Sequence, residues 1–323
     1  MWIELLAITG GFLLLAWSAD RFVEGASAIA LNLNISPLVI GLTIVSLGTS
    51  APEIIVSGMA AWQGNSGLAV GNAIGSNIFN IALILGITAL IMPLNVHSSI
   101  IRRELPMLLL VMAFAWMLLV DGMLGRMDGV LLLAGMAGML GWLTWEGLKT
   151  QATPDPVVSE FAGEMPVGIG IGRAFFLLAT GALILLVSSR LLVWGAVSVA
   201  QAFGISDLVI GLTIVALGTS LPELAASVTS ALKHEHDIAI GNVIGSNIFN
   251  LLAVLGLPGL INPIRIDSMV LSRDYPVMLG LTLMLFAMAF GIKGPGRLNR
   301  IEGGLLLLAF VAYQTLLYFT ERS

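Results

Sequence analysis

The chain has 323 residues, of which 58% are hydrophobic and only 10% are charged, and its mean hydropathy is +1.00. A soluble protein carries about 25% charged residues, so this composition excludes an ordinary soluble globule and is typical of a protein with many membrane-spanning helices. The net charge of −5 gives no basic surface for nucleic acid, and the absence of cysteine excludes disulfides, cysteine-ligated metal centres and a thiol nucleophile.

The first apolar stretch predicts a membrane helix and not a signal peptide, because Glu4 stands where a signal peptide would have Lys or Arg. Apolar stretches of about 17 to 25 residues mark the further spans. The sequence predicts an all-α polytopic membrane protein with ten spans, near 4–30, 37–62, 68–92, 104–121, 128–148, 172–203, 207–232, 238–261, 274–292 and 301–320.

One long polar connection, residues 149–171, interrupts the apolar pattern and contains three prolines, Pro154, Pro156 and Pro166. Such a segment is typical of a surface linker. We therefore expect a first five-helix half over residues 1–148, a cytoplasmic linker over 149–171 and a second five-helix half over 172–323.

The two halves are copies of one another at an offset of 170 residues. GLTIVSLGTS at 41–50 matches GLTIVALGTS at 211–220 in nine of ten positions, and GNAIGSNIFN at 71–80 matches GNVIGSNIFN at 241–250 equally well. A repeat this sharp indicates duplicated architecture.

Each copy contains an odd number of predicted spans, so the second copy must enter the membrane from the opposite side. This predicts inverted repeats, with a shared binding site near the membrane midplane. With both termini outside, the cytoplasmic loops would hold eight Lys and Arg residues and the outer loops four, which favours this orientation in the cell (inner) membrane.

The conspicuous chemical feature is an acid within an apolar span, present twice, as Glu53 in GTSAPE and Glu223 in GTSLPE. An ionised carboxylate at the centre of a membrane helix costs about 2.5–3.5 kcal/mol. A pair with the intramembrane Arg21 or Arg190, or protonation, would be a purely structural answer. Retention of the acid with its whole polar surroundings in both copies favours a functional site instead.

These surroundings are typical of a site for hard cations. Pro52 and Pro222 lack the N–H that would bond the carbonyls of Gly48 and Gly218, so each helix should break there and free backbone oxygens. Ca²⁺ prefers six to eight oxygen ligands, carboxylates among them. Hydroxyl groups beside each acid add to this set, from Thr49, Ser50, Thr219 and Ser220.

The second motif adds further oxygen ligands. Ser76 and Asn80 are four residues apart and share one helix face, as do Ser246 and Asn250. We expect Asn80 and Asn250 to ligate, and we expect Gly71, Gly75, Gly241 and Gly245 to permit close helix packing. The pattern does not decide between these two roles for Asn72, Asn77, Asn242 and Asn247.

GTSxPE followed by GNxIGSNIxN, in two copies on ten spans, resembles the calcium/cation antiporter superfamily, most closely its bacterial sodium/calcium exchanger branch. The resemblance implies Ca²⁺ coordination by Glu53 and Glu223 with Thr49 and Thr219. It implies Na⁺ sites formed by those acids with Ser50, Ser220, Ser76, Ser246, Asn80 and Asn250. Potassium-dependent members of this superfamily have Asp where this chain has Asn250, which argues against potassium co-transport.

The sequence thus predicts a membrane antiporter that exchanges Na⁺ for Ca²⁺ by alternating access, without a cofactor and without enzymatic activity. The nearest alternative is a proton-coupled antiporter of Ca²⁺ or another divalent cation, in which the two acids titrate. A distant alternative is an intramembrane carboxylate enzyme, although a general acid/base pair does not need a duplicated hydroxyl shell and a helix break. The cluster His234–Asp237 is interpreted as a solvated turn.

Overall fold

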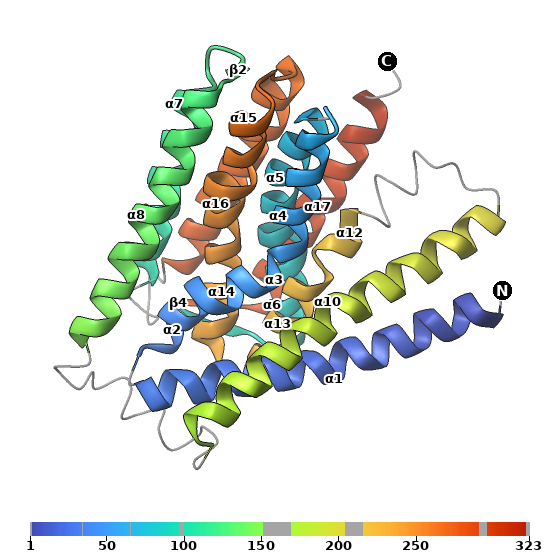
Figure 1. Ribbon diagram of the computed structural model, residues 1–323, viewed down its shortest axis with the longest axis vertical. Helices are drawn as coiled ribbons and strands as arrows, with labels where there is room; N and C mark the ends of the chain where they lie inside the picture. The colour runs from blue at the N-terminus through green and yellow to red at the C-terminus, as the bar shows by residue number, and fades with distance from the viewer. Residues whose placement is uncertain are drawn as a thin grey trace. The chain divides into compact units, whose positions relative to one another are not determined.

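The computed structural model describes residues 2–33, 35–64, 66–96, 100–150, 169–203, 216–290 and 296–320. These ranges are helical apart from turns and four strands of two or three residues, which confirms the predicted helical class (Figure 1). Most of the predicted linker, residues 151–168, lies outside the described residues. So do residues 204–215, which include the beginning of the predicted span 207–232 and half of the motif GLTIVALGTS.

Within the described ranges, seven helices are long and apolar enough to cross a membrane, and a bent pair of helices raises the number to eight. They correspond to eight of the ten predicted spans. The predicted span 104–121 corresponds to a 15-residue α-helix, α7 (Leu105–Leu119), preceded by a π-helical turn, η3 (Ile100–Glu104). It is not among the eight because η3 carries three charged residues, Arg102, Arg103 and Glu104. The other remaining span begins outside the described residues.

The described structure divides into two compact units, and each unit takes segments from both halves of the sequence. Unit 1 consists of Met1–Pro52 and Gly141–Asn242, and unit 2 of Glu53–Leu140 and Val243–Ser323. The units group residues by contact, whereas the predicted repeats group them by sequence similarity, so the two divisions differ.

The longest helices of unit 1 are α1 (Trp2–Leu33) and α10 (Ile171–Ala202). The GTSAPE motif follows a short series of helical segments, and the second copy of the motif lies between two more. These shorter elements of unit 1 are α2 (Pro37–Ile40), η1 (Gly41–Val45), α3 (Ser46–Thr49), α12 (Ala216–Thr219), α13 (Leu221–Leu232) and the first half of α14 (His236–Phe249).

Helices α1 and α10 pack closely along their length through glycines. A Cβ added to Gly11 would lie 3.1 Å from the Cβ of Leu192, and one added to Gly181 would lie 2.6 Å from the backbone nitrogen of Phe22. Early residues of α1 therefore lie beside late residues of α10, so the two helices are antiparallel, as Figure 1 shows. Both the two glycines and their two neighbours are related by the offset of 170.

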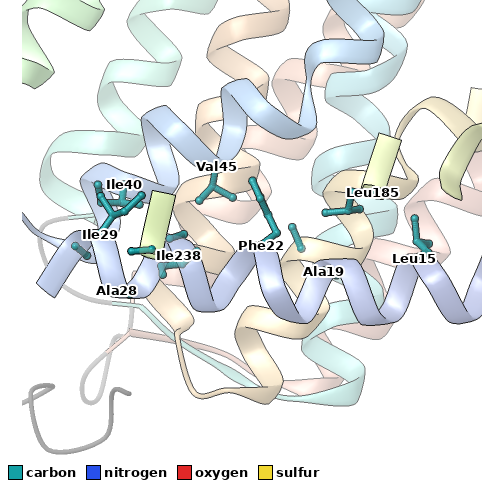
Figure 2. Packing of buried hydrophobic residues seen from close by; sticks show 13 residues of the cluster. Leu15, Ala19, Phe22, Ala28, Ile29, Ile40, Val45, Leu185 and Ile238 are labelled. Carbon is teal, nitrogen blue, oxygen red and sulfur yellow. The ribbon is translucent and has the colours of Figure 1, made fainter. Parts of the chain in front are cut away.

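The core of unit 1 combines small residues of α1 with branched residues of the neighbouring segments. Figure 2 shows Phe22 and Ile29 of α1 packed with Ile40, Val45 and Ile238. Because lipid is as apolar as leucine, such helices associate through close packing rather than through exclusion of water.

Unit 2 contains the second motif of the first copy, the second motif of the second copy apart from its first two residues, Gly241 and Asn242, and the remaining helices. Its elements are most of α4 (Ala51–Trp62), α5 (Ser66–Ile78), η2 (Phe79–Leu85), α6 (Gly86–Ile91), β1 (Leu94–Val96), η3, α7, β2 (Met123–Leu124), most of α8 (Arg126–Thr150), the second half of α14, η5 (Asn250–Val254), α15 (Gly256–Ile261), β3 (Ile264–Arg265), η6 (Val270–Asp274), α16 (Tyr275–Ala289), β4 (Gly296–Leu298) and α17 (Arg300–Thr320).

Contacts within unit 2 recur in equivalent pairs. Strand β1 pairs antiparallel with β4, with Leu94 opposite Leu298, while β2 pairs antiparallel with β3. An added Cβ on Gly303 would lie 2.8 Å from the carbonyl oxygen of Gly86, and one on Gly129 would lie 2.6 Å from that of Gly256. Gly86 and Gly256 are 170 residues apart, so the same glycine crossing forms twice, each time between a first-half and a second-half helix.

Candidate functional site

Both copies of the GTSxPE motif interrupt their helix at the serine. Helix α3 ends at Thr49 and α4 begins at Ala51. Ser50 has φ −81° and ψ 5°, and Ser220, between α12 and α13, has φ −91° and ψ 6°. The two breaks therefore share one local backbone conformation, which the proline two residues further on favours because it cannot donate to the carbonyl four residues before it.

In unit 1, the acid of the second copy meets the hydroxyl of the first. The Oγ of Ser50 donates a hydrogen bond to Oε1 of Glu223 at 3.0 Å, and Glu223 is only 1% exposed. The other carboxylate oxygen, Oε2, and the Oγ of Ser220 are buried without a hydrogen-bond partner among the residues that the structure describes. Both are free to accept from, or coordinate, a further group.

Asn242, also in unit 1, holds this arrangement from the neighbouring helix α14. Its Nδ2 donates to the backbone carbonyl of Glu223 at 3.3 Å and to Oγ of Ser227 at 2.9 Å, while its Oδ1 accepts from Oγ1 of Thr49 at 3.0 Å. This amide therefore connects both copies of the GTSxPE motif, and both its nitrogen and its oxygen have partners.

In unit 2, Asn72 makes the equivalent two bonds to the helix that carries Glu53. Its Nδ2 donates to the backbone carbonyl of Glu53 at 3.3 Å and to Oγ of Ser57 at 2.9 Å. The distances match those of Asn242 in the other unit. Both asparagines, whose role the sequence pattern did not decide, therefore orient the helix that carries the acid.

Four asparagines of unit 2 form a mutual network. The Nδ2 of Asn80 donates to Oδ1 of Asn247 at 3.0 Å, and the Nδ2 of Asn250 donates to Oδ1 of Asn77 at 3.1 Å. The Nδ2 of Asn77 donates in turn to the backbone carbonyl of Asn247 at 3.3 Å. Asn77 and Asn247, the other two asparagines that the pattern left undecided, thereby fix which way the amides of Asn80 and Asn250 point.

This network leaves acceptor oxygens without partners. The Oδ1 atoms of Asn80 and Asn250 are buried and accept no hydrogen bond within the described part of the chain, and the same holds for Oγ of Ser246. Asn80 lies in the π-helical turn η2 and Asn250 begins the π-helical turn η5. Such turns occur frequently at functional sites. Buried, unpartnered oxygens of this kind need an explanation, and a bound cation is one.

The remaining predicted residues differ in burial. Glu53, Thr49 and Ser76 are buried, with exposed fractions of 1%, 1% and 6%, whereas Thr219 is partly exposed. An added Cβ on Gly241 would lie 2.9 Å from the carbonyl oxygen of Leu38, so helices cross closely there. At Gly71 and Gly75, by contrast, no atom of the described structure lies within 4 Å of an added Cβ.

Basic side chains do not neutralise Glu223. Arg21 instead pairs with Glu24 of its own helix, with 2.9 Å between Nη1 and Oε2, and Glu223 has no ion pair with a basic residue within the described ranges. A buried charge of this kind is balanced by a proton or by a bound cation.

The chemistry of the site is that of oxygen ligands around single carboxylates. Among the described residues, no group of three or more His, Cys, Asp and Glu side chains could hold a metal ion. Hydroxyl, amide and carboxylate oxygens suit Ca²⁺ and Na⁺ and do not suit zinc or copper.

The polar turn after α13 has its own structural partners. The Nζ of Lys233 lies 2.8 Å from Oδ1 of Asp20 in α1 and donates to the backbone carbonyl of Asp20 at 3.0 Å. His234 has a φ of 62° in this turn. Lys233 thus connects the turn to α1, a contact between residues more than 200 positions apart that the sequence did not predict.

Known proteins share this architecture. The chain matches the family described as sodium/calcium exchanger protein over residues 3–145 and 173–319. It is 51% identical over 318 residues to antiporter CaxA of Alkalimonas amylolytica, which covers 98% of this chain and 99% of that protein. It is 46% identical over 312 residues to inner membrane protein YrbG of Escherichia coli strain K12, covering 96% and 95%. A solved structure of the sodium-calcium exchanger NCX_Mj is similar with a TM-score of 0.81 and 32% identity, covering 96% of this chain and 97% of that one.

Proposed function

The chain belongs to the sodium/calcium exchanger protein family, a family of membrane transporters and not of enzymes, and from this premise we propose that it exchanges Na⁺ for Ca²⁺ by alternating access. The observation that carries the proposal is the buried carboxylate of Glu223. One of its oxygens accepts from Ser50 and the other has no partner among the described residues. A buried and unsatisfied oxygen calls for a bound partner, and carboxylate oxygens are preferred ligands of Ca²⁺.

The proposed ligands fall into one set in each unit. Both sets combine one acid with neutral oxygens, which is the composition that Ca²⁺ and Na⁺ prefer. The unit 1 set consists of Glu223, Thr49, Ser50, Thr219 and Ser220, and the unit 2 set of Glu53, Ser76, Asn80, Ser246 and Asn250. The ions draw on both sets. In this proposal the Ca²⁺ ligands are the two acids, Thr49 and Thr219, and the Na⁺ ligands are the two acids, the four serines, Asn80 and Asn250.

Exchange follows from the charge of the two acids. When both are ionised they contribute −2, and moving that charge past the hydrophobic barrier is costly. One Ca²⁺ or two Na⁺ cancel it, so only the loaded forms change readily between the outward-facing and inward-facing states. A further Na⁺ bound by neutral oxygens would leave about +1 and would make the exchange electrogenic.

The proposal includes a topology of ten spans in two inverted repeats, with both termini outside the inner membrane. The antiparallel packing of α1 and α10, which occupy equivalent positions in the two copies, supports this arrangement. Because the chain has no cysteine, single cysteines introduced at Gln151 and Ser323 can be labelled selectively in intact cells. We expect a membrane-impermeant maleimide to label the variant Ser323→Cys and to leave Gln151→Cys unlabelled.

Na⁺-gradient-driven uptake of ⁴⁵Ca²⁺ into proteoliposomes tests the proposal. The parent protein should take up Ca²⁺, and Glu53→Gln and Glu223→Gln should each lose uptake. Asp121→Asn is the matched control, because it removes an exposed acid in a turn. Full activity in either Gln variant would remove that acid from the ligands. Uptake driven by a proton gradient alone, and not by Na⁺, would favour the proton-coupled alternative.

A further inference from the structure

The two helix breaks are not held in the same way. In the second copy, Pro222 cannot donate to the carbonyl of Gly218, and this carbonyl accepts instead from Oγ of Ser189 in α10 at 2.8 Å. Ser189 is 4% exposed, and all three residues belong to unit 1. A side chain from a neighbouring helix thus satisfies the backbone oxygen that the proline leaves free.

The contact around this hydrogen bond is tight. An added Cβ on Gly218 would lie only 2.1 Å from Cγ2 of Val193, which is one helical turn beyond Ser189 on the same face of α10. Such a distance leaves room only for glycine. The break between α12 and α13 is therefore packed directly against α10, and the hydroxyl of Ser189 has a fixed partner.

The first copy lacks this hydroxyl. The repeat offset of 170 places Ala19 where the second copy has Ser189, and Ala19 is a fully buried residue of the α1 core, as Figure 2 shows. A Cβ added to Gly48, the equivalent of Gly218, would lie 3.1 Å from the ring of Phe22. The first break therefore packs against an aromatic ring of α1, whereas the second break is hydrogen-bonded to α10.

From this difference we propose that Ser189 is a positioning residue for ion binding. By holding the carbonyl of Gly218, it sets the backbone of the following residues, Thr219 and Ser220, and through them the start of the helix that carries Glu223. The inference rests on the proposed exchange function and adds to it a residue outside the ligand sets. It also makes the two copies unequal, because among the described residues a side-chain hydrogen bond attaches the second break to its long helix and none attaches the first.

Ser189→Ala tests this role, with Ser188→Ala as the matched control. Ser188 is its buried neighbour in α10, and its hydroxyl donates only to Leu185 of the same helix, at 3.0 Å. We expect Ser189→Ala to raise the apparent KM for Ca²⁺ and Na⁺ roughly three- to tenfold, as befits one lost hydrogen bond, with the maximal rate per folded protein within about twofold of the parent. Ser188→Ala should leave both parameters unchanged.

A second pair of variants separates the loss of the hydroxyl from a change in side-chain size or a folding defect. Thr and Val have almost the same shape, but only Thr keeps the hydroxyl, so Ser189→Thr should retain a KM within about twofold of the parent while Ser189→Val should not. Equal KM values for the Ala variant and its control, or for the Thr and Val variants, would overturn the inference.

The outcome is separable from that of the proposed function. Failure of the parent to show Na⁺-driven Ca²⁺ uptake would contradict the exchange function alone. The Ca²⁺ concentration that half-maximally protects purified protein against thermal unfolding needs no transport. That concentration should rise in Ser189→Ala and Ser189→Val and not in Ser188→Ala. An unchanged value in all variants would contradict the role of Ser189.

Discussion

Asn250 donates its amide to Oδ1 of Asn77 at 3.1 Å, and this single hydrogen bond decides which way the side chain of Asn250 points. Its own Oδ1 is left buried and without a partner in the described structure. Asn247 orients Asn80 in the corresponding way. In unit 2, each copy of the second motif therefore has one asparagine that presents an oxygen, Asn80 or Asn250. The other asparagine, Asn77 or Asn247, orients the presenting asparagine of the other copy.

This division predicts different defects for the two kinds of asparagine. Asn250→Leu removes the presented oxygen and should raise the apparent KM for Na⁺ at least about tenfold, which corresponds to about 1.4 kcal/mol. Asn77→Ala removes the acceptor that orients Asn250 and a donor to the carbonyl of Asn247, but no presented oxygen, so a smaller rise is expected. Na⁺ dependence of Ca²⁺ uptake measures both. The same KM in Asn250→Leu as in the parent would exclude Asn250 from the Na⁺ ligands.

Potassium should have no part in the cycle, because an amide and not a carboxylate stands at position 250. Replacing K⁺ by choline on both sides of the proteoliposome membrane should leave Na⁺-driven Ca²⁺ uptake unchanged. The variant Asn250→Asp restores the residue expected of potassium-dependent exchangers and serves as the comparison. A parent protein that requires K⁺ for uptake would contradict the assignment.

Asn242 should matter for stability as well as for ion binding, since it makes three hydrogen bonds inside unit 1. Asn242→Ala leaves a buried carbonyl and two hydroxyls without this partner, at a cost of about 1–3 kcal/mol. Thermal unfolding in detergent should therefore shift to lower temperature. Asn95→Ala, at an exposed position of β1, is the control and should unfold like the parent.

Two glycines of α8 should respond to alanine with opposite changes in stability, because only one of them lies at a helix crossing of unit 2. An added Cβ on Gly129 would lie 2.4 Å from the backbone nitrogen of Leu260, so Gly129→Ala should destabilise the protein by about 1–3 kcal/mol or more. Gly138, also in α8, has no atom of the described structure within 4 Å of an added Cβ. Gly138→Ala should stabilise by about 0.5–1 kcal/mol, because alanine has the higher helix propensity. Thermal unfolding of the two variants side by side checks both signs.

Much of the fold could be predicted from sequence patterns, because the features concerned are local. Long apolar runs predict membrane helices without knowledge of their neighbours, and the helices described here follow eight of the ten predicted runs. The same holds for Pro52 and Pro222, since a missing N–H acts on the carbonyl four residues earlier in the same helix.

The partners of the polar residues could not be predicted in the same way. Ser57 and Ser227 bond to asparagines 15 residues away, and Ser189 reaches a carbonyl 29 residues away. Only the fold brings such groups together. The repeat was the available signal for Asn72 and Asn242. An asparagine present at the same place in both copies makes the same two hydrogen bonds in each, at the same distances.

The π-helical turns and the short strands also lack a sequence signal. Asn80 and Asn250 occupy π-helical turns within segments whose apolar pattern predicts ordinary helix. Strands β1 to β4 are too short for a period of two to be read from them.

The central claim is that ion-free carboxylates prevent the transporter from changing state, and Ca²⁺ efflux from sealed proteoliposomes tests it most directly. Vesicles loaded with ⁴⁵Ca²⁺ are diluted into choline solution at the internal pH, with Na⁺, with unlabelled Ca²⁺, or with neither. We expect efflux with either ion and no efflux in choline alone. Efflux that continues at the same rate in choline would contradict exchange and, with it, the role assigned to Glu53 and Glu223.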